Sequence, residues 1–147
     1  MKRFCFPISM VIALGACTAG SPARPAAFSA CESVLREQAA AWNRGDIDAF
    51  AKGYRKSEHT VFASTSGVSI GYDAMLARYK KRYPDKQAMG MLTFSKLGFR
   101  QLDKSHVIVE GRWHLQKAKQ AGGRFVLVMR ADSKGGYRVA LDYTTSD

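Results

Sequence analysis

The chain has 147 residues, of which 46% are hydrophobic and 24% are charged. This length suits a single domain, and the composition excludes general disorder, so one hydrophobic core is expected. The formal net charge of +11 biases the protein toward anionic surroundings.

The first sixteen residues have the layout of a secretory signal. Two cations precede an apolar run, Phe4 to Leu14, which is shorter than the roughly 20 residues that a membrane-spanning helix needs. The sequence Leu14-Gly15-Ala16-Cys17 then resembles the lipobox of bacterial lipoproteins, whose cysteine thiol receives a diacylglycerol. We therefore expect residues 1–16 to be a lipoprotein signal peptide. An ordinary secreted or soluble periplasmic protein is the alternative.

This reading predicts an envelope protein that faces the periplasm and is held in the membrane through Cys17. The outer membrane is favoured because Thr18 is not the aspartate that resembles an inner-membrane retention signal. Removing the two cations of the signal from +11 would leave +9, which favours anionic lipids or acidic metabolites as partners, and we expect no nucleic acid. Residues 17–28 are rich in Pro and Ala and are expected to form a tether before a domain at 29–147.

Three helices are predicted in the first half of that domain. Ser29 and Glu32 have the spacing of a capping box, and Gly45 suits the end of the first helix. Asp46 has the character of an N-cap for the second helix. The third helix has an amphipathic pattern. Its basic end, which consists of Arg78, Lys80, Lys81 and Arg82, is expected to be solvated or to face lipid headgroups. The predicted helices span 29–43, 47–54 and 72–83.

Six strands are predicted from period-two alternation and turn residues. Their expected ranges are 59–63, 68–70, 89–100, 107–116, 124–130 and 137–143. Gly90 and Gly98 are expected to bend the third strand. Consecutive strands with short links favour an antiparallel meander, and helices grouped early in the chain must cover one face of it, so the fold class is α+β.

The alternation also predicts the faces of the last two strands. Phe125, Leu127, Met129, Tyr137, Val139, Leu141 and Tyr143 are expected to point toward the helices. Val126, Val128, Arg130, Arg138, Ala140 and Asp142 are expected to point outward. An outer face with two valines is unusually apolar for a solvated surface and predicts a dimer.

Several short motifs, taken in their order, carry a resemblance to a known family. They are Trp42-Asn43-Arg44-Gly45-Asp46-Ile47-Asp48-Ala49-Phe50, Gly71-Tyr72-Asp73-Ala74-Met75, Gly111-Arg112-Trp113, Arg124-Phe125-Val126-Leu127-Val128 and Gly136-Tyr137-Arg138-Val139. From Ser29 to Thr145 the chain resembles the nuclear transport factor 2-like superfamily, in particular its SnoaL-like branch. The resemblance implies a cone-shaped, strongly curved antiparallel sheet with three N-terminal helices packed in its concave face. It also implies an apolar pocket and frequent homodimers.

Ketosteroid isomerase is an enzyme of this shape, and the chain departs from its pattern. The resemblance would place the isomerase base at or near Phe62, the phenol of the first helix at Gln38 and the protonated acid near Leu127. Phe62 and Leu127 cannot move a proton, so the isomerase mechanism is not supported.

The weak candidates for acid/base catalysis are His59, Glu110 and His114. Glu110 and His114 alternate on one strand with Arg112 between them, where a carboxylate beside Arg and His could have a perturbed pKa. A cross-strand ladder of ion pairs on the outer side of the sheet, with Arg130 and Asp142 as neighbours, is the favoured interpretation of that strand. His59 is expected to be a solvated residue at a strand end.

Ten residues are expected to surround the cavity or to fill it as core. They are Trp42, Phe62, Tyr72, Met75, Tyr79, Met89, Met91, Trp113, Leu141 and Tyr143. Aromatic and Met linings accept apolar ligands. No set of residues has metal-ligand spacing and no phosphate-binding loop is present, so no metal and no cofactor are predicted.

These patterns predict a lipid-anchored module that binds a small apolar ligand or a partner. An isomerase-type or dehydratase-type enzyme that acts on a small apolar substrate in the pocket is the alternative. A structural module held electrostatically against the envelope is a third possibility.

Overall fold

The structure is a computed structural model that describes residues 24–147. The predicted signal peptide and Cys17 lie outside the described residues. The helices are α1 (Ala26–Asn43), α2 (Ile47–Ala51), α3 (Tyr72–Arg82) and α4 (Lys86–Met89). The strands are β1 (Val61–Ser64), β2 (Gly67–Ile70), β3 (Met91–Gln101), β4 (His106–Gln116), β5 (Ala121–Ala131) and β6 (Tyr137–Thr144).

Helix α1 begins three residues earlier than predicted. Pro25 occupies the N-cap position, and its carbonyl accepts a hydrogen bond from the Phe28 amide at 2.9 Å. The predicted capping box is wrong, because no side chain caps this helix and Glu32 pairs with Arg24 instead. The Phe28 ring stacks on Phe99 at 5.6 Å between centroids, so the earlier start extends the contact of α1 with the sheet.

The junction between the first two helices follows the prediction. Gly45 has a φ of +84°, and the Asp46 carboxylate accepts a hydrogen bond from the Ala49 amide at 2.8 Å. Helix α2 is shorter than expected, because Tyr54 leaves it and forms a parallel bridge with Val139 of β6. Helix α4 was not predicted, since a single turn is too short to show a helical period.

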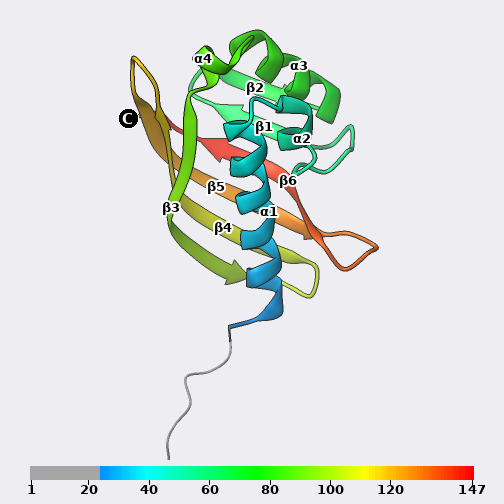
Figure 1. Ribbon diagram of the computed structural model, residues 1–147. Coiled ribbons are helices and arrows are strands. Elements are labelled where there is room, and N and C mark those ends of the chain that lie inside the picture. The colour runs from blue at the N-terminus through cyan, green and yellow to red at the C-terminus, as the bar shows by residue number, and fades with distance from the viewer. Residues whose placement is uncertain (1–23) are drawn as a thin grey trace, which may run out of the picture.

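The six strands form one sheet in the order β2-β1-β6-β5-β4-β3 (Figure 1). The meander from β3 to β6 is antiparallel, as predicted. The prediction of a wholly antiparallel sheet is wrong at one place, because β1 pairs with β6 in parallel and brings the β1–β2 hairpin to the edge that β6 would otherwise expose. Helix α1 lies across one face of this sheet (Figure 1) and packs on β3, β4 and β6. The main core lies between them.

Two irregularities shape the sheet. On β3 the pairing with β4 shifts between Ser95 and Gly98, and Lys96 adopts a positive φ of +52° there. This bulge lies beside Gly98, one of the two glycines predicted to bend the strand. The second shift lies on β6, where Val128 faces Leu141 but Met129 faces Val139, so one residue of β6 has no partner on β5. That residue is Ala140.

The extra residue at Ala140 reverses the faces of the end of β6. Leu141 and Tyr143 lie on the outer face with exposed fractions of 37% and 53%, while Asp142 is 6% exposed on the inner face. The prediction of inward Leu141 and Tyr143 and outward Asp142 is therefore wrong. Strict alternation assumes an unbroken pleat, and a bulge shifts every later side chain to the other face.

The five residues Phe125, Leu127, Met129, Tyr137 and Val139 are buried, as the alternation predicts. All of them precede the bulge or lie on β5. Between residues 24 and 147, no helix combines the length and the apolar character that crossing a membrane would require.

Candidate functional site

A pocket of about 150 Å³ opens between the inner face of the sheet and helices α1, α2 and α3. Every strand of the sheet except β2 contributes a side chain to it. Its wall on the side of α1, α2 and β3–β5 is apolar apart from Gln38, whose side-chain amide donates a hydrogen bond to the Phe50 carbonyl at 3.2 Å. The apolar members of this wall are Leu35, Trp42, Phe50, Leu92, Phe94, Trp113, Leu115, Phe125 and Leu127. The side formed by β1, β6 and α3 carries the polar groups Ser64, Thr65, Ser66, Arg78, Arg82, Asp142 and Thr144. One side of the pocket is therefore mainly apolar and the other side is mainly polar.

Asp142 is the carboxyl group of this lining. Its Oδ2 accepts a hydrogen bond of 2.6 Å from the hydroxyl of Tyr54, and its Oδ1 has no hydrogen-bond partner among the described residues. Burial raises the pKa of the Asp142 carboxyl from its ordinary 3.8 to about 7, although the Tyr54 hydrogen bond lowers it. The side chain can therefore both hold and release a proton near neutral pH. Because Tyr54 donates to Oδ2, the carboxyl proton belongs on Oδ1, which is free.

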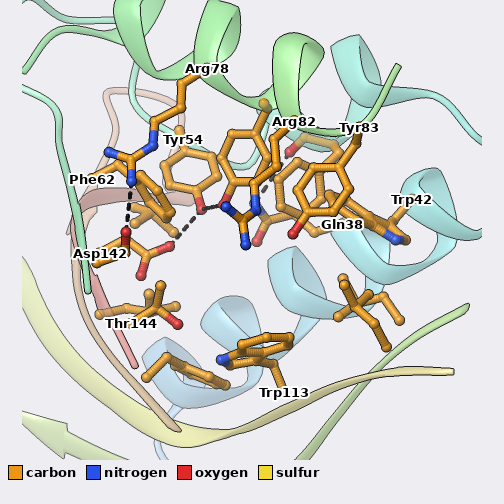
Figure 2. A pocket seen from close by; sticks show the side chains of 18 of the residues that line it. Gln38, Trp42, Tyr54, Phe62, Arg78, Arg82, Tyr83, Trp113, Asp142 and Thr144 are labelled. Atoms are coloured by element: carbon orange, nitrogen blue, oxygen red, sulfur yellow. Dashed lines mark hydrogen bonds between the residues drawn. The ribbon is translucent and has the colours of Figure 1, made fainter. Parts of the chain in front are cut away.

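Tyr54 and Tyr79 extend this polar group into a network. Their hydroxyl oxygens are 3.1 Å apart, and since Tyr54 donates to Asp142, Tyr79 donates to Tyr54 (Figure 2). Burial, followed by the nearby Asp142 carboxyl, raises the pKa of both phenols well above its ordinary value, so both stay protonated. Tyr79 also packs on Phe50 and Phe62, at centroid distances of 5.1 and 5.2 Å, which fixes the network against the aromatic wall.

Two arginines of α3 reach the pocket. Both extend from the helix toward the cavity, opposite Trp113 (Figure 2). Arg78 lies over the ring of Phe62 at 5.0 Å and donates hydrogen bonds of 2.7 Å to the hydroxyls of Ser64 and Ser66. It was predicted to belong to a basic helix end that is solvated or faces lipid headgroups. The structure instead places it against the β1–β2 turn, half-buried.

Four of the ten residues predicted around the cavity line it. They are Trp42, Phe62, Tyr79 and Trp113. Met75 and Met89 are buried in the core at 0% and 1% exposure, Tyr72 is half-buried beside α2, and Met91 is 48% exposed. Leu141 and Tyr143 lie on the outer face because of the β6 bulge. None of these six lines the pocket.

The three weak catalytic candidates lie outside the pocket. His59 is exposed and pairs with Glu58 at 3.5 Å. Glu110 and His114 are exposed on β4, and neither contributes to the lining. The interpretation of this strand as an ion-pair ladder is also wrong, because Arg112 pairs with the C-terminal Asp147 and Asp142 faces inward. Among residues 24–147, no three His, Cys, Asp or Glu side chains gather in a way that could hold a metal ion.

Sequence reasoning missed the polar residues that do converge: Tyr54, Arg78, Arg82 and Asp142. The position near Leu127, where the isomerase resemblance would place an acid, contains no acid on β5. Its cross-strand neighbour on β6 is Asp142, so a carboxyl reaches the same part of the pocket from the adjacent strand. Register across two strands is not visible in the local sequence. The available signal in the sequence was the lone carboxyl of Asp142 between the apolar residues Leu141 and Tyr143.

Comparison with known proteins agrees with this architecture. No protein-family model matches the chain, and no curated protein sequence matches it. Among solved structures, a nuclear transport factor 2-like protein of unknown function from Shewanella oneidensis MR-1 is 32% identical, with a TM-score of 0.76, over 80% of this chain and 98% of that one.

Two further neighbours share the fold at lower identity. A ketosteroid isomerase-like protein from Erwinia carotovora atroseptica is 15% identical, with a TM-score of 0.66 over 80% of this chain and 94% of that one. A scytalone dehydratase-like protein from Novosphingobium aromaticivorans is 10% identical, with a TM-score of 0.64 over 82% and 83%. The Shewanella relative is similar along almost its whole length, so this chain belongs to the nuclear transport factor 2-like superfamily.

Proposed function

We propose that this domain binds a small, mainly aromatic molecule in the pocket between α1, α3 and the sheet. The observation that carries this proposal is the free Oδ1 of Asp142. The residue is 6% exposed, lines the cavity and has one oxygen without a partner among the described residues. Buried polar atoms in folded proteins nearly always have a partner, and a polar group of a ligand would supply it.

The walls set the size and character of that ligand. Trp42 and Trp113 bring indole rings to the lining, with Phe50, Phe62 and Phe94 around them. A cavity of about 150 Å³ that is open to solvent accommodates a compound of one or two rings. Stacking and edge contacts with the rings favour a planar aromatic body.

The binding proposal is tested with a neutral two-ring probe, 2-naphthamide, by isothermal titration calorimetry. Thr144→Trp places an indole at the half-buried rim of the pocket and is expected to reduce binding at least about tenfold, since it removes the space for the ring. Thr93→Trp adds the same side chain on an exposed position of β3 and is expected to leave binding unchanged. Equal binding by both variants, or no binding by the wild-type protein, would refute the proposal.

A second function is favoured by the chemistry of Asp142. A carboxyl with a pKa of about 7 that is joined to two phenols can transfer a proton to and from a bound molecule. This supports an isomerase-type or dehydratase-type activity as the alternative, in keeping with the names of two structural neighbours. Catalysed exchange of the α-protons of a bound ketone with D₂O, lost in Asp142→Asn, would identify an enzyme, and its absence with a bound ketone would leave a binding protein.

We also propose that the protein is a lipoprotein anchored through Cys17 to the outer membrane and facing the periplasm. The support is in the sequence, where the four residues Leu14 to Cys17 follow an apolar leader at the required place. In this location a pocket for small molecules would serve capture within the cell envelope.

A homodimer through the outer face of the sheet completes the proposal. The register places Ile70, Val61, Leu141 and Val128 side by side on four strands. The next row consists of Val68, Ala63, Tyr143 and Val126. Five of these side chains are at least 37% exposed, namely Val68, Ile70, Val126, Leu141 and Tyr143. A continuous apolar face of this kind is typical of a surface that a second copy of the chain covers.

A further inference from the structure

We propose that the ligand of this pocket carries a carboxylate, which binds at the pocket mouth to Arg82 with the fixed charge of Arg78 behind it. This inference rests on the proposed binding function and names the class of its ligand: a small aromatic acid.

The mouth is identified by the exposed members of the lining. They are Thr65 and Ser66 in the β1–β2 turn, Arg82 at the end of α3, and Ser146 near the C-terminus. Arg78 lies one helical turn before Arg82 on α3 and is half-buried against the β1–β2 turn. Both guanidinium groups therefore belong to the rim, while the aromatic wall lies deeper.

Arg78 is held in place by neutral partners. Its Nη1 donates to the Gly67 carbonyl at 3.0 Å and to the Ser69 hydroxyl at 3.3 Å. Its Nη2 donates to the hydroxyls of Ser64 and Ser66, both at 2.7 Å. These contacts satisfy the four terminal N–H groups but neutralise none of the charge, because no ion pair between described residues includes Arg78.

The two serines hold the Arg78 guanidinium at this rim. Their hydroxyl oxygens are 3.0 Å apart, and each accepts a hydrogen bond from Arg78. The Ser64 hydroxyl also donates to the Gly67 carbonyl at 3.5 Å, so both hydroxyl protons have acceptors within the turn. The turn therefore contributes the fixed positive charge of Arg78 to the rim, and a positive charge there is suited to an anion.

Arg82 supplies the remaining donors. It makes no side-chain hydrogen bond and no ion pair with another residue in 24–147, and its guanidinium lies 5.9 Å from the centre of the Tyr83 ring. Its planar fork is therefore available for the two oxygens of a carboxylate. In Figure 2 it extends into the space between Tyr54 and Tyr83, toward the cavity.

The charge of the two arginines is not offset inside the pocket. Asp142 is the carboxyl among the described lining residues, and with a pKa of about 7 it is about half protonated at pH 7 and more fully protonated below that pH. A ligand that pairs with Arg82 by its carboxylate can place its aromatic body against Trp113. Its far end then lies toward Asp142 Oδ1. One molecule would thus supply the counter-charge, the apolar surface and the missing hydrogen-bond partner.

The experiment compares two probes of nearly the same size and shape, 2-naphthoate and 2-naphthamide, by titration calorimetry on the wild-type protein. The first carries a charged carboxylate and the second a neutral amide. We expect the acid to bind about tenfold more tightly, because a hydrogen bond to a charged group is worth roughly one factor of ten or more in affinity. Arg82→Gln is expected to abolish this preference without weakening the binding of the amide. Arg130→Gln removes an exposed arginine from the outer end of β5 and is expected to preserve the preference.

The outcomes separate the two proposals. If the amide and the acid bind wild-type protein equally, the carboxylate site is wrong while the binding function stands. If neither probe binds the wild-type protein, both the binding function and the carboxylate site are refuted. If the preference persists in Arg82→Gln and in Arg78→Gln, neither arginine holds the carboxylate, and the inference is overturned. The result for Arg78→Gln counts only if circular dichroism and the unfolding midpoint show that this variant is folded. If it is not folded, the test rests on Arg82→Gln, which breaks no hydrogen bond in the described fold.

Discussion

At the scale of a single residue, Asp142 lowers the stability of the folded protein in two ways. It is buried, and one of its oxygens lacks a partner among the described residues. Its pKa in the folded protein, about 7, lies above the ordinary 3.8, so between these values the folded state holds a proton that the unfolded chain releases. The contribution of Asp142 to the free energy of unfolding therefore falls as the pH rises from about 4 to about 7, and it is constant above that range. Over the whole range this contribution changes by roughly 4 kcal/mol.

Asp142→Asn is expected to remove this pH dependence. The amide oxygen still accepts the hydrogen bond from Tyr54, but the side chain cannot ionise. The variant should therefore be more stable than the wild-type protein at pH 8, by about 2 to 4 kcal/mol, and similar to it at pH 4.5. Urea denaturation of both proteins across this range measures the difference in their free energies of unfolding. A constant difference at all pH values would contradict the prediction, and Asp73→Asn on the exposed side of α3 is the control.

The β6 strand shows how one element serves two surfaces. The extra residue at Ala140 turns Asp142 into the pocket and turns Leu141 and Tyr143 outward in the same step. Without the bulge the pocket would gain two apolar side chains and lose its carboxyl. The outer face would then gain a charge in the middle of its apolar rows.

Leu141→Glu is expected to separate the proposed dimer into monomers. Leu141 lies between Val61 of β1 and Val128 of β5, so a carboxylate there would be buried without a partner in a face-to-face dimer. Sedimentation velocity at micromolar concentration should show the mass of one chain for the variant and of two for the wild-type protein. Leu102→Glu changes an equally apolar, 52% exposed residue in the β3–β4 turn and should leave the dimer intact. Identical masses for wild type and Leu141→Glu would rule out this interface.

At the scale of the whole molecule, a basic domain and a lipid anchor would act together. The charge that would remain without the proposed signal peptide is +9, and it would attract the protein to anionic lipids with a strength that salt screens. A diacyl anchor resists salt, since its contribution comes from buried CH₂ groups. The two contributions can therefore be separated experimentally.

Cys17→Ser is expected to release the protein from membranes in a bacterial host. The wild-type protein should incorporate radiolabelled palmitate and stay in the membrane pellet after a 1 M salt wash, which shortens the Debye length to roughly 3 Å. The serine variant should incorporate no label and should be extracted by the wash. Cys31→Ser changes a fully buried cysteine of α1 and should keep both properties of the wild type. Wild-type protein without palmitate would exclude the anchor.

The local sequence alone determined the type of every element between residues 24 and 147 except the single-turn helix α4. Asp46 and Gly45 specify the turn between α1 and α2 because their side-chain and backbone chemistry acts over four residues. The alternation on the strands from Val107 to Val139 specifies the buried face of β4, β5 and the first half of β6 for the same reason, since period two is a property of neighbouring residues. The superfamily followed from the order of these elements and of their motifs.

The tertiary structure decided what lies in the pocket. Asp142, Tyr54 and Tyr79 are brought together by a bulge, by a bridge between Tyr54 and Val139, and by the packing of α3 over β1. Each of these depends on pairing between segments far apart in the chain, and a shift of one residue reverses the face of every side chain that follows. Arg78 and Arg82 looked like a solvated helix end for the same reason, because only the position of the β1–β2 turn shows that they border a cavity.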